Sequence, residues 1–299
     1  MEPKTYVYKQ VGECRIHADI YQPQPTSVLR PLVMFIHGGG LIYGSRKDIN
    51  PKQLELYLNA GYVIVSIDYR LAPEAKLPAI ITDLQDAFGW IYDHGTELCS
   101  ADAQRMAVVG HSAGGYLTLM AGFCVRPRAL VSFYGYGDIV GTWYREPDPF
   151  YCQQPVVSEE QSGKLVEGPV ISEPSVERGK DNFYLYCRHN GLWPQEVGGH
   201  DPRTVPSFFV LFCPLRNVTP DYPPTLLLHG DQDTDVPYEQ SVLMAEMLSR
   251  HRVEHGLITT NGGGHGFDRD MSDPFVTESF ATVLAFLENH IGTGTQARR

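Results

Sequence analysis

Short apolar runs alternate along this chain with longer stretches in which apolar residues recur every three or four positions. The short runs predict strands and the longer stretches predict amphipathic helices. Two early segments, Thr5–Lys9 and Arg15–Tyr21, alternate polar and apolar residues as an antiparallel edge pair would. The later runs are continuously apolar, which is typical of strands buried on both faces of a sheet. These runs are Leu32–Ile36, Tyr62–Ile67, Met106–Val109, Ala129–Tyr134, Thr225–Leu228 and Glu254–Ile258.

Helical patterns lie between these runs and after the last one. Their alternation with strands predicts an α/β protein with a mostly parallel central sheet and helices on both faces. Open sheets of this kind bind ligands at the carboxyl ends of their strands, so chemistry is expected there. The helices are expected at Pro51–Asn59, Ala79–Asp93, Ala113–Phe123, Tyr238–Arg250 and Asp273–His290.

One connection is far longer than the others. About ninety residues separate Tyr134 from Thr225, where a loop of a few residues would suffice. The stretch is rich in aromatic residues and proline, and Ser158-Glu-Glu-Gln161 has the capping-box pattern of a helix start. We therefore expect a lid at residues 138–222, inserted into a core formed by residues 1–137 and 223–291. An ordinary surface excursion is the alternative, and residues 292–299 are expected to be a flexible tail.

Composition narrows the classes of partner. The 299 residues carry a formal net charge of −11, which argues against a nucleic-acid binder. No apolar run is long enough to span a bilayer, and the amino terminus lacks the pattern of a signal peptide. The six cysteines are scattered and are expected to be free thiols. A cytoplasmic protein is expected, and an edge strand or the last helix could form a homodimer.

A short motif follows the strand Met106–Val109 and opens a helical pattern. Gly110-His-Ser112-Ala-Gly114 is the sequence of a nucleophile elbow in this strand-turn-helix context. The serine occupies strained backbone there, and side chains two residues before or after it would collide, so both positions need glycine. The helix amino terminus directs partial positive charge at the hydroxyl. Ser112 is therefore the candidate nucleophile.

A second glycine-rich loop, His37-Gly-Gly-Gly40, ends the strand Leu32–Ile36. Without side chains, its backbone N–H groups can approach a substrate oxygen and stabilise the anion that forms during acyl transfer. A flexible turn or a phosphate-binding loop are the alternatives. The sequence has no phosphate-loop motif, and Gly135 to Gly141 has the wrong spacing for a dinucleotide fingerprint. No cofactor is implied.

The base that accepts the serine proton must be a histidine held by an acid. His265 follows the last strand in a glycine-rich loop, and Asp233 lies in the loop after Thr225–Leu228. The chain order serine, aspartate, histidine is the one expected for this fold class. Asp231 and Asp235 compete with Asp233, which the geometry of the strand end favours.

His251-Arg-Val-Glu-His255 formally matches a zinc-binding motif. That motif requires both histidines on one helical face. Here the helix is expected to end near Arg250 and a strand to begin by Glu254, so no metal is implied.

Together these motifs resemble those of the hormone-sensitive-lipase-like branch of the α/β-hydrolases. The resemblance includes Asp68-Tyr-Arg-Leu-Ala-Pro-Glu74, which is specific to that branch, and His265-Gly-Phe267. It implies the α/β-hydrolase fold, hydrolysis of carboxylesters, and an oxyanion hole formed by Gly39, Gly40 and Ala113. His111 stands where that branch usually has an acid, and in this respect the chain is similar to feruloyl-esterase-like and arylformamidase relatives.

The expected activity is a serine carboxylesterase that cleaves short-chain or aromatic acyl esters, with a small-molecule ester as its partner. An amidase or arylformamidase would use the same triad on a C–N bond, and sequence does not separate the two. A non-catalytic binding protein of this fold is a third alternative, although all three triad residues are present. The side chains expected to line the substrate pocket are His111, Trp143, Tyr144, Phe150 and Trp193.

Overall fold

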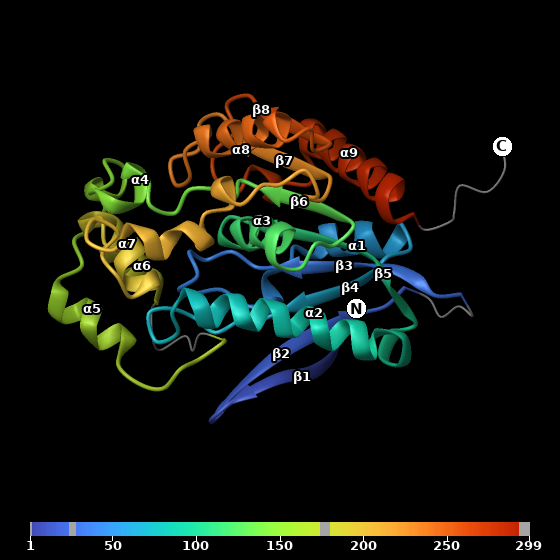
Figure 1. The fold of residues 1–299 in the computed structure, drawn as a ribbon, viewed down its shortest axis with the longest axis horizontal. Helices are drawn as coiled ribbons and strands as arrows, with labels where there is room; N and C mark the ends of the chain where they lie inside the picture. Colours follow the sequence, from blue (N-terminus) through green and yellow to red (C-terminus); the bar gives the residue numbers. More distant parts are fainter. Residues whose placement is uncertain (1, 24–27, 174–179, 293–299) are drawn as a thin grey trace.

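A single sheet of eight strands forms the centre of the computed structural model, which describes residues 2–23, 28–173 and 180–292 (Figure 1). The strand order is β1-β2-β4-β3-β5-β6-β7-β8. The first two strands pair antiparallel, β2 pairs antiparallel with β4, and every other pair is parallel. The strands are β1 (Lys4–Val11), β2 (Cys14–Tyr21), β3 (Arg30–Ile36), β4 (Val63–Ile67), β5 (Ala101–His111), β6 (Ala129–Phe133), β7 (Thr225–Gly230) and β8 (His255–Thr260).

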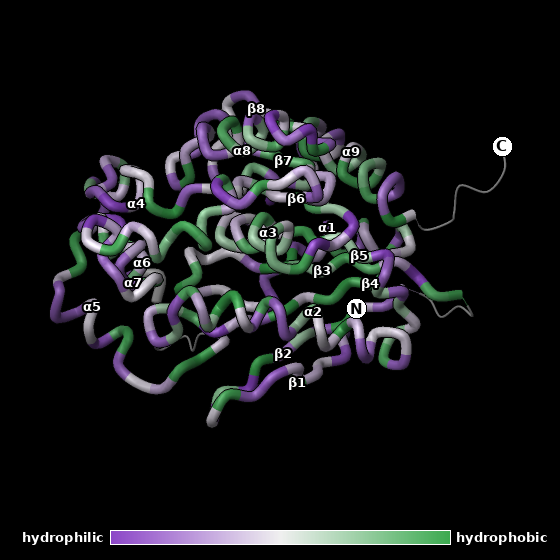
Figure 2. Tube along the Cα trace, viewed as in Figure 1, coloured by the Kyte–Doolittle hydropathy of each residue, from purple (hydrophilic) through white to green (hydrophobic). Residues whose placement is uncertain are grey.

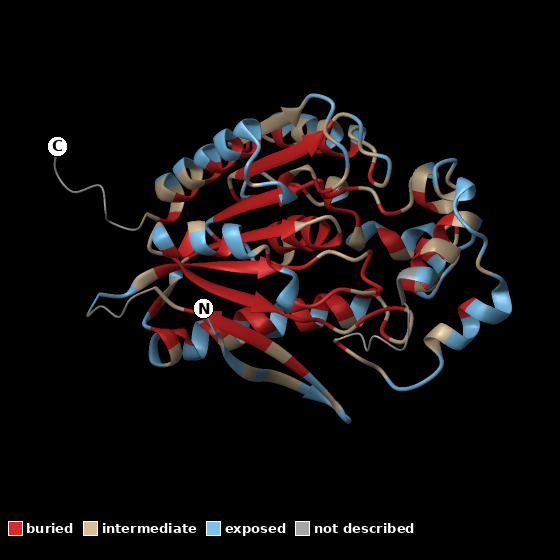
Figure 3. Cartoon of the chain, turned by 180° about the vertical axis from the view of Figure 1, so that it is seen from behind, coloured by how far each residue is buried: buried red, intermediate tan, exposed pale blue. Residues whose placement is uncertain are grey.

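The sheet confirms the strands expected from the apolar runs. All residues of β4 and β6 are buried, because helices cover both faces of the sheet and leave no polar side for them. The hairpin β1–β2 is different, since most residues of β1 are exposed at the edge of the sheet (Figure 3). The hydropathy pattern follows this arrangement, with apolar colour concentrated along the inner strands (Figure 2).

Helices pack on both faces of the sheet, as expected. On one face, α1 (Pro51–Asn59) and α9 (Pro274–Ile291) share an apolar cluster with β3, β5 and β6. On the other face, α2 (Leu77–Cys99), α3 (Ala113–Cys124) and α8 (Glu239–Arg250) bury their apolar sides. Helix α2 extends beyond the predicted Ala79–Asp93 at both ends. The fold is therefore the expected α/β-hydrolase architecture.

The long connection between β6 and β7 lies beyond the carboxyl ends of the strands (Figure 1). Ser158 begins α5 with the capping box that the sequence predicts, since its hydroxyl accepts a hydrogen bond from the N–H of Gln161. Buried residues of the connection, such as Tyr144 and Phe209, belong to the same apolar cluster as α2 and α3. The connection contains α4 (Thr142–Arg145), η2 (Tyr151–Gln153), α5 (Glu159–Val166), α6 (Lys180–Asn190), α7 (Trp193–Gly198), η4 (Pro206–Phe212) and η5 (Pro214–Arg216).

The expected tail falls outside the described residues, apart from Gly292. Across the three described ranges, no helix combines the length and apolar character needed to cross a membrane. The cysteines among these residues are free thiols, as expected.

Candidate active site

The turn at Ser112 joins the end of β5 to the start of α3. Ser112 has φ 56° and ψ −118°, a backbone conformation that a non-glycine residue adopts at an energetic cost. A Cβ atom on Gly110 would collide with the carbonyl of Gly114, and one on Gly114 would collide with the carbonyl of Ile36. The glycines on either side therefore allow the close packing that holds Ser112 in this turn.

His265 and Asp233 meet above the carboxyl ends of β7 and β8. Nδ1 of His265 lies 2.8 Å from Oδ2 of Asp233, while the other oxygen of Asp233 accepts hydrogen bonds from the N–H groups of Asp235 and Val236. Nε2 of His229 lies 3.2 Å from the same Oδ2. Burial alone would raise the pKa of Asp233, but the hydrogen bonds with His229 and His265 outweigh it and hold the pKa well below the usual range. Asp233 is therefore an ionised partner for His265.

The two competing aspartates occupy different places. Oδ1 of Asp231 accepts a hydrogen bond from the N–H of Gly262 and holds the loop that carries His265. Oδ2 of Asp235 lies 3.4 Å from Nε2 of His265, the opposite side of the ring from Asp233. Burial alone would lower the pKa of His265, but Asp235 and then Asp233 outweigh burial and raise it.

The loop His37–Gly40 lies against the elbow. A Cβ atom on Gly38 would lie 2.9 Å from the carbonyl oxygen of His111 and 3.3 Å from Cβ of Ser112. Gly39 and Gly40 both have positive φ, at 100° and 59°. Burial lowers the pKa of His37 to about 4, so its neutral ring can donate from Nδ1 to the carbonyl of Gly38. The glycine loop, Ser112 and the first N–H of α3 at Ala113 are thus brought to one place.

A cavity of about 230 Å³ lies beside the elbow and the glycine loop. Ser112, His265, Gly39 and Gly40 all line it, as does His111. Tyr134 lines it too, and its ring centroid lies 4.6 Å from that of His265. The remaining lining residues are Phe35, His37, Gly38, Tyr43, Gly44, Asp48, Asn50, Gln53, Asp235, Asp268 and Arg269.

One wall of the cavity contains buried polar residues that the sequence analysis did not single out. Asp268 accepts hydrogen bonds from Gln53 at 2.7 Å and from the hydroxyl of Tyr134 at 2.7 Å, and Nε2 of His111 lies 3.1 Å from it. Burial would raise the pKa of Asp268, but His111 and the two hydrogen bonds hold it well below the usual range. Asp268 follows the His265-Gly-Phe267 motif directly, which could have drawn attention to it. Nothing local marks Gln53, which is far away in sequence.

The four aromatic residues expected to line the pocket lie elsewhere, and only His111 of that predicted set is among the lining residues. Trp193 and Tyr144 are buried and stack on each other with ring centroids 4.1 Å apart, and Trp143 stacks on Tyr144. Phe150 is exposed. The rings of Tyr144 and Trp193 belong to the apolar cluster that includes α2 and α3, which explains why these two side chains do not face the cavity.

Two residues of the connection support the glycine loop from outside the cavity. Nε1–H of Trp193 donates to the carbonyl of Gly40 at 2.7 Å. Tyr184 on α6 lies so close to Gly40 that a Cβ atom there would be 2.5 Å from its ring. The connection therefore restrains the backbone of Gly40, which lines the cavity.

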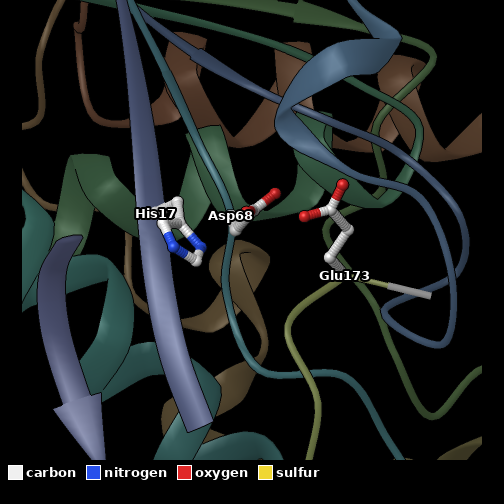
Figure 4. Close-up of side chains that lie close together, drawn as sticks. All are labelled: His17, Asp68 and Glu173. Carbon is white, nitrogen blue, oxygen red and sulfur yellow. The ribbon is translucent and has the colours of Figure 1, made fainter. Parts of the chain in front are cut away.

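A cluster of possible metal ligands, His17, Asp68 and Glu173, lies apart from this site (Figure 4). Their ligand atoms are within 4.8 Å of one another. Arg46, however, lies 2.6 Å from Asp68 and 3.0 Å from Glu173, so a guanidinium already neutralises these carboxylates. The donor set fits an ion-pair network better than a metal site. His251 and His255 also fail the geometry of a zinc motif, since the first follows α8 and the second begins β8.

Two family models match parts of the chain. The BD-FAE model matches residues 18–140, and the prolyl oligopeptidase family model matches residues 192–294. Among curated proteins, the chain is 31% identical to the non-reducing polyketide synthase Preu6 of Preussia isomera and 29% identical to the non-reducing polyketide synthase stbA of Stachybotrys bisbyi. These matches cover 90% and 89% of this chain but only 14% of each synthase.

Solved structures share the fold over nearly the whole chain. A protein of unknown function from Staphylococcus aureus subsp. aureus Mu50 has a TM-score of 0.78 at 24% identity, covering 96% of this chain and 99% of that one. An alpha/beta hydrolase superfamily protein from Enterococcus faecalis has a TM-score of 0.74 at 21% identity, covering 96% and 98%. A thermophilic esterase from Thermogutta terrifontis has a TM-score of 0.71 at 21% identity, covering 99% and 95%. The chain therefore has the α/β-hydrolase fold.

Proposed function

We propose that this chain is a serine carboxylesterase that cleaves short-chain or aromatic acyl esters through an acyl-enzyme intermediate. The observation that carries the proposal is that Ser112, in a nucleophile elbow, lines the same small cavity as His265, whose other nitrogen is held by Asp233. A cavity of about 230 Å³ suits a short acyl or small aromatic group. The thermophilic esterase with a similar structure supports this proposal.

In this mechanism the hydroxyl of Ser112 attacks the ester carbonyl carbon while Nε2 of His265 accepts its proton. Asp233 keeps the imidazole oriented and stabilises the imidazolium that forms. The N–H groups of Gly39, Gly40 and Ala113 stabilise the oxyanion. Removing one such donor typically costs about 3 to 4 kcal/mol of transition-state stabilisation. His265 then protonates the leaving alcohol. In the second half of the reaction, Nε2 of His265 accepts a proton from water while the water oxygen attacks the acyl carbon, and it returns that proton to Oγ of Ser112 as the bond between the acyl group and Ser112 breaks.

The subfamily and the division of the chain are further parts of the proposal. The motifs favour the hormone-sensitive-lipase-like branch, with residues 138–222 as a lid inserted between core residues 1–137 and 223–291. The contacts from Trp193 and Tyr184 to Gly40 support a lid that also restrains the oxyanion hole. An amidase or arylformamidase remains the alternative, because the same triad would serve a C–N bond.

A second candidate function follows from the polyketide synthase relatives. A segment of hydrolase fold within a protein that builds acyl chains would act on the acyl group, either by hydrolysis or by transfer. Thioester cleavage uses the same nucleophile and oxyanion hole as ester cleavage. The match covers 90% of this chain, which is why a thioester belongs among the substrates tested.

The test compares wild type with Ser112→Ala on p-nitrophenyl esters of rising acyl length, an N-acetylcysteamine thioester, methyl ferulate and N-formylkynurenine. We expect wild type to cleave short esters and the variant to lose at least about three orders of magnitude in kcat. Ser162→Ala is the control, because Ser162 is a buried serine of α5 outside the cavity lining. Turnover of formylkynurenine or the thioester alone would replace the esterase assignment, and equal rates for both proteins would refute Ser112 as nucleophile.

A further inference from the structure

The cavity has a second polar region beside the elbow, which the esterase mechanism does not use. It is formed by Gln53 on α1, His111 before the nucleophile, and Asp268 after the triad histidine, and we call these three residues the polar recess. Gln53 is 1% exposed and Asp268 is 2% exposed. Buried polar side chains that line a cavity next to a nucleophile are suited to recognising a polar group of the substrate.

The main observation is that a buried hydrogen-bond acceptor of Gln53 has no partner among the described residues. The amide nitrogen of Gln53 donates to Asp268, at 2.7 Å to its carboxylate and 3.1 Å to its carbonyl. Its amide oxygen Oε1 is buried and has no hydrogen-bond partner among the residues that the structure describes. Buried polar atoms are almost always paired in native proteins, so this oxygen leaves an acceptor for a donor from outside the protein, either water or a group of the substrate. A hydroxyl group supplies such a donor.

The charges around the recess decide which polar group fits. Asp268, Asp48 and Asp235 place three carboxylates around the cavity, and His111 together with the hydrogen bonds described above holds the pKa of Asp268 well below its usual range. Arg269 is an exposed cation at the same cavity. The negative charge of Asp268 would repel a substrate carboxylate in the recess, whereas it would not repel a neutral hydroxyl.

We propose that the polar recess binds a hydroxyl group of the substrate near the scissile bond, so that the preferred esters carry a hydroxyl on the acyl or alcohol part. This inference rests on the proposed esterase function. It predicts that substrates are selected by hydrogen bonding as well as by acyl chain length. A site that pairs with a hydroxyl loses affinity for the analogue that lacks this group.

The experiment compares kcat/KM for matched esters. On the acyl side the pair is p-nitrophenyl butyrate and p-nitrophenyl 3-hydroxybutyrate. On the alcohol side the set is propyl acetate, 3-hydroxypropyl acetate and 3-acetoxypropanoate, followed by acid release. For at least one side we expect the hydroxyl ester to exceed its matched analogue by about tenfold or more, and the carboxylate to be the poorest of its set.

Gln53→Leu keeps the approximate size of the side chain and removes the amide, so we expect the hydroxyl preference to fall to about onefold. Gln240→Leu is the matched control: Gln240 is another buried glutamine, its oxygen accepts from the N–H of Asp138, and it does not line the cavity. This control should keep the preference of wild type. Circular dichroism and thermal melting establish that both variants are folded.

A measurement on wild type alone applies if Gln53→Leu does not fold. Here 1,3-propanediol and 1-propanol are compared as inhibitors of p-nitrophenyl acetate hydrolysis, and the diol should inhibit at least about fivefold better. Ester hydrolysis without any hydroxyl preference would overturn the inference and leave the proposed function intact. A folded Gln53→Leu that keeps the preference would overturn it too. If wild type cleaves no ester, the proposed function fails and the inference fails with it.

Discussion

Asp235 is a second carboxylate beside His265, in addition to the Asp233 of the proposed triad. Its Oδ2 lies 3.4 Å from Nε2 of His265, the nitrogen that accepts the serine proton in the proposed mechanism. Its Oδ1 accepts hydrogen bonds from Tyr184 and Arg188 on α6. The imidazole of His265 is therefore placed between two carboxylates, and the second of them is tied to the inserted connection.

This placement predicts a pH effect. Burial lowers the pKa of His265, Asp235 and Asp233 raise it, and Arg269 lowers it, with a net increase. Because the base must be neutral, activity is lost as the pH falls below this raised pKa. In Asp235→Asn the carboxylate charge is gone, so the acidic limb of kcat/KM against pH should move to lower pH.

The control for Asp235→Asn is Asp148→Asn. Asp148 also pairs with Arg188, at 2.5 Å, but makes no contact with His265 among the described residues, so its replacement should leave the acidic limb where it is in wild type. The measurement is kcat/KM for one short p-nitrophenyl ester between pH 4 and pH 9. An acidic limb that stays fixed in Asp235→Asn would contradict the electrostatic role.

At the scale of elements, Arg188 on α6 links the long connection between β6 and β7 to the loop after β7 that contains Asp233 and Asp235. This side chain has no exposed area, pairs with Asp148 and Asp235, and lies over the rings of Tyr144 and Tyr151 at 4.9 and 4.7 Å. A buried cation with two carboxylates and aromatic neighbours forms a network in which each charge depends on the others.

Arg188→Met tests that network. The variant leaves the carboxylates of Asp148 and Asp235 without their buried cation, and breaking such a pair costs about 3 to 5 kcal/mol. We expect Tm to fall by about 10 °C in calorimetry or circular dichroism. Arg203→Met is the control in the same connection, since Arg203 is exposed and donates to a single carbonyl. If the two variants had the same Tm, the buried network around Arg188 would contribute no more to stability than the exposed side chain of Arg203.

Sequence patterns were sufficient for those parts of the molecule whose structure depends on local residues. Continuous apolar runs located the buried strands, and the glycines around Ser112 located the elbow because their spacing answers a local steric need. The expected pairing of His265 with Asp233 depended on strand-end positions, which the parallel sheet makes regular. The fold and the candidate triad could therefore be predicted from the sequence.

Contacts between segments that are distant in the sequence could not be predicted in the same way. Gln53 and Asp268 are 215 positions apart, and only the packing of α1 beside the loop after β8 brings them together. The aromatic residues of the connection gave a misleading signal, because the same composition suits a pocket wall and a buried apolar core. Trp193 and Tyr144 belong to the core.

At the scale of the whole molecule, two buried carboxylates link stability to pH. Burial would raise the pKa of Asp233 and Asp268, but their hydrogen bonds and histidine neighbours lower both below the usual value near 3.9. A group whose pKa is lowered by folding stabilises the protein above its unfolded pKa. That stabilisation is lost as the pH falls towards the folded pKa.

We therefore expect the free energy of unfolding to decrease between pH 5 and pH 2.5, and to decrease less in Asp268→Asn, measured relative to each protein's own value at pH 5. Urea unfolding followed by fluorescence measures both. Asp93→Asn is the control, because Asp93 is exposed on α2 and its replacement should leave the pH dependence as in wild type. An Asp268→Asn curve parallel to that of wild type would show that this carboxylate is not held ionised by folding. In that case the hydrogen bonds from Gln53 and Tyr134 would contribute no more in the ionised state of Asp268 than in its neutral state.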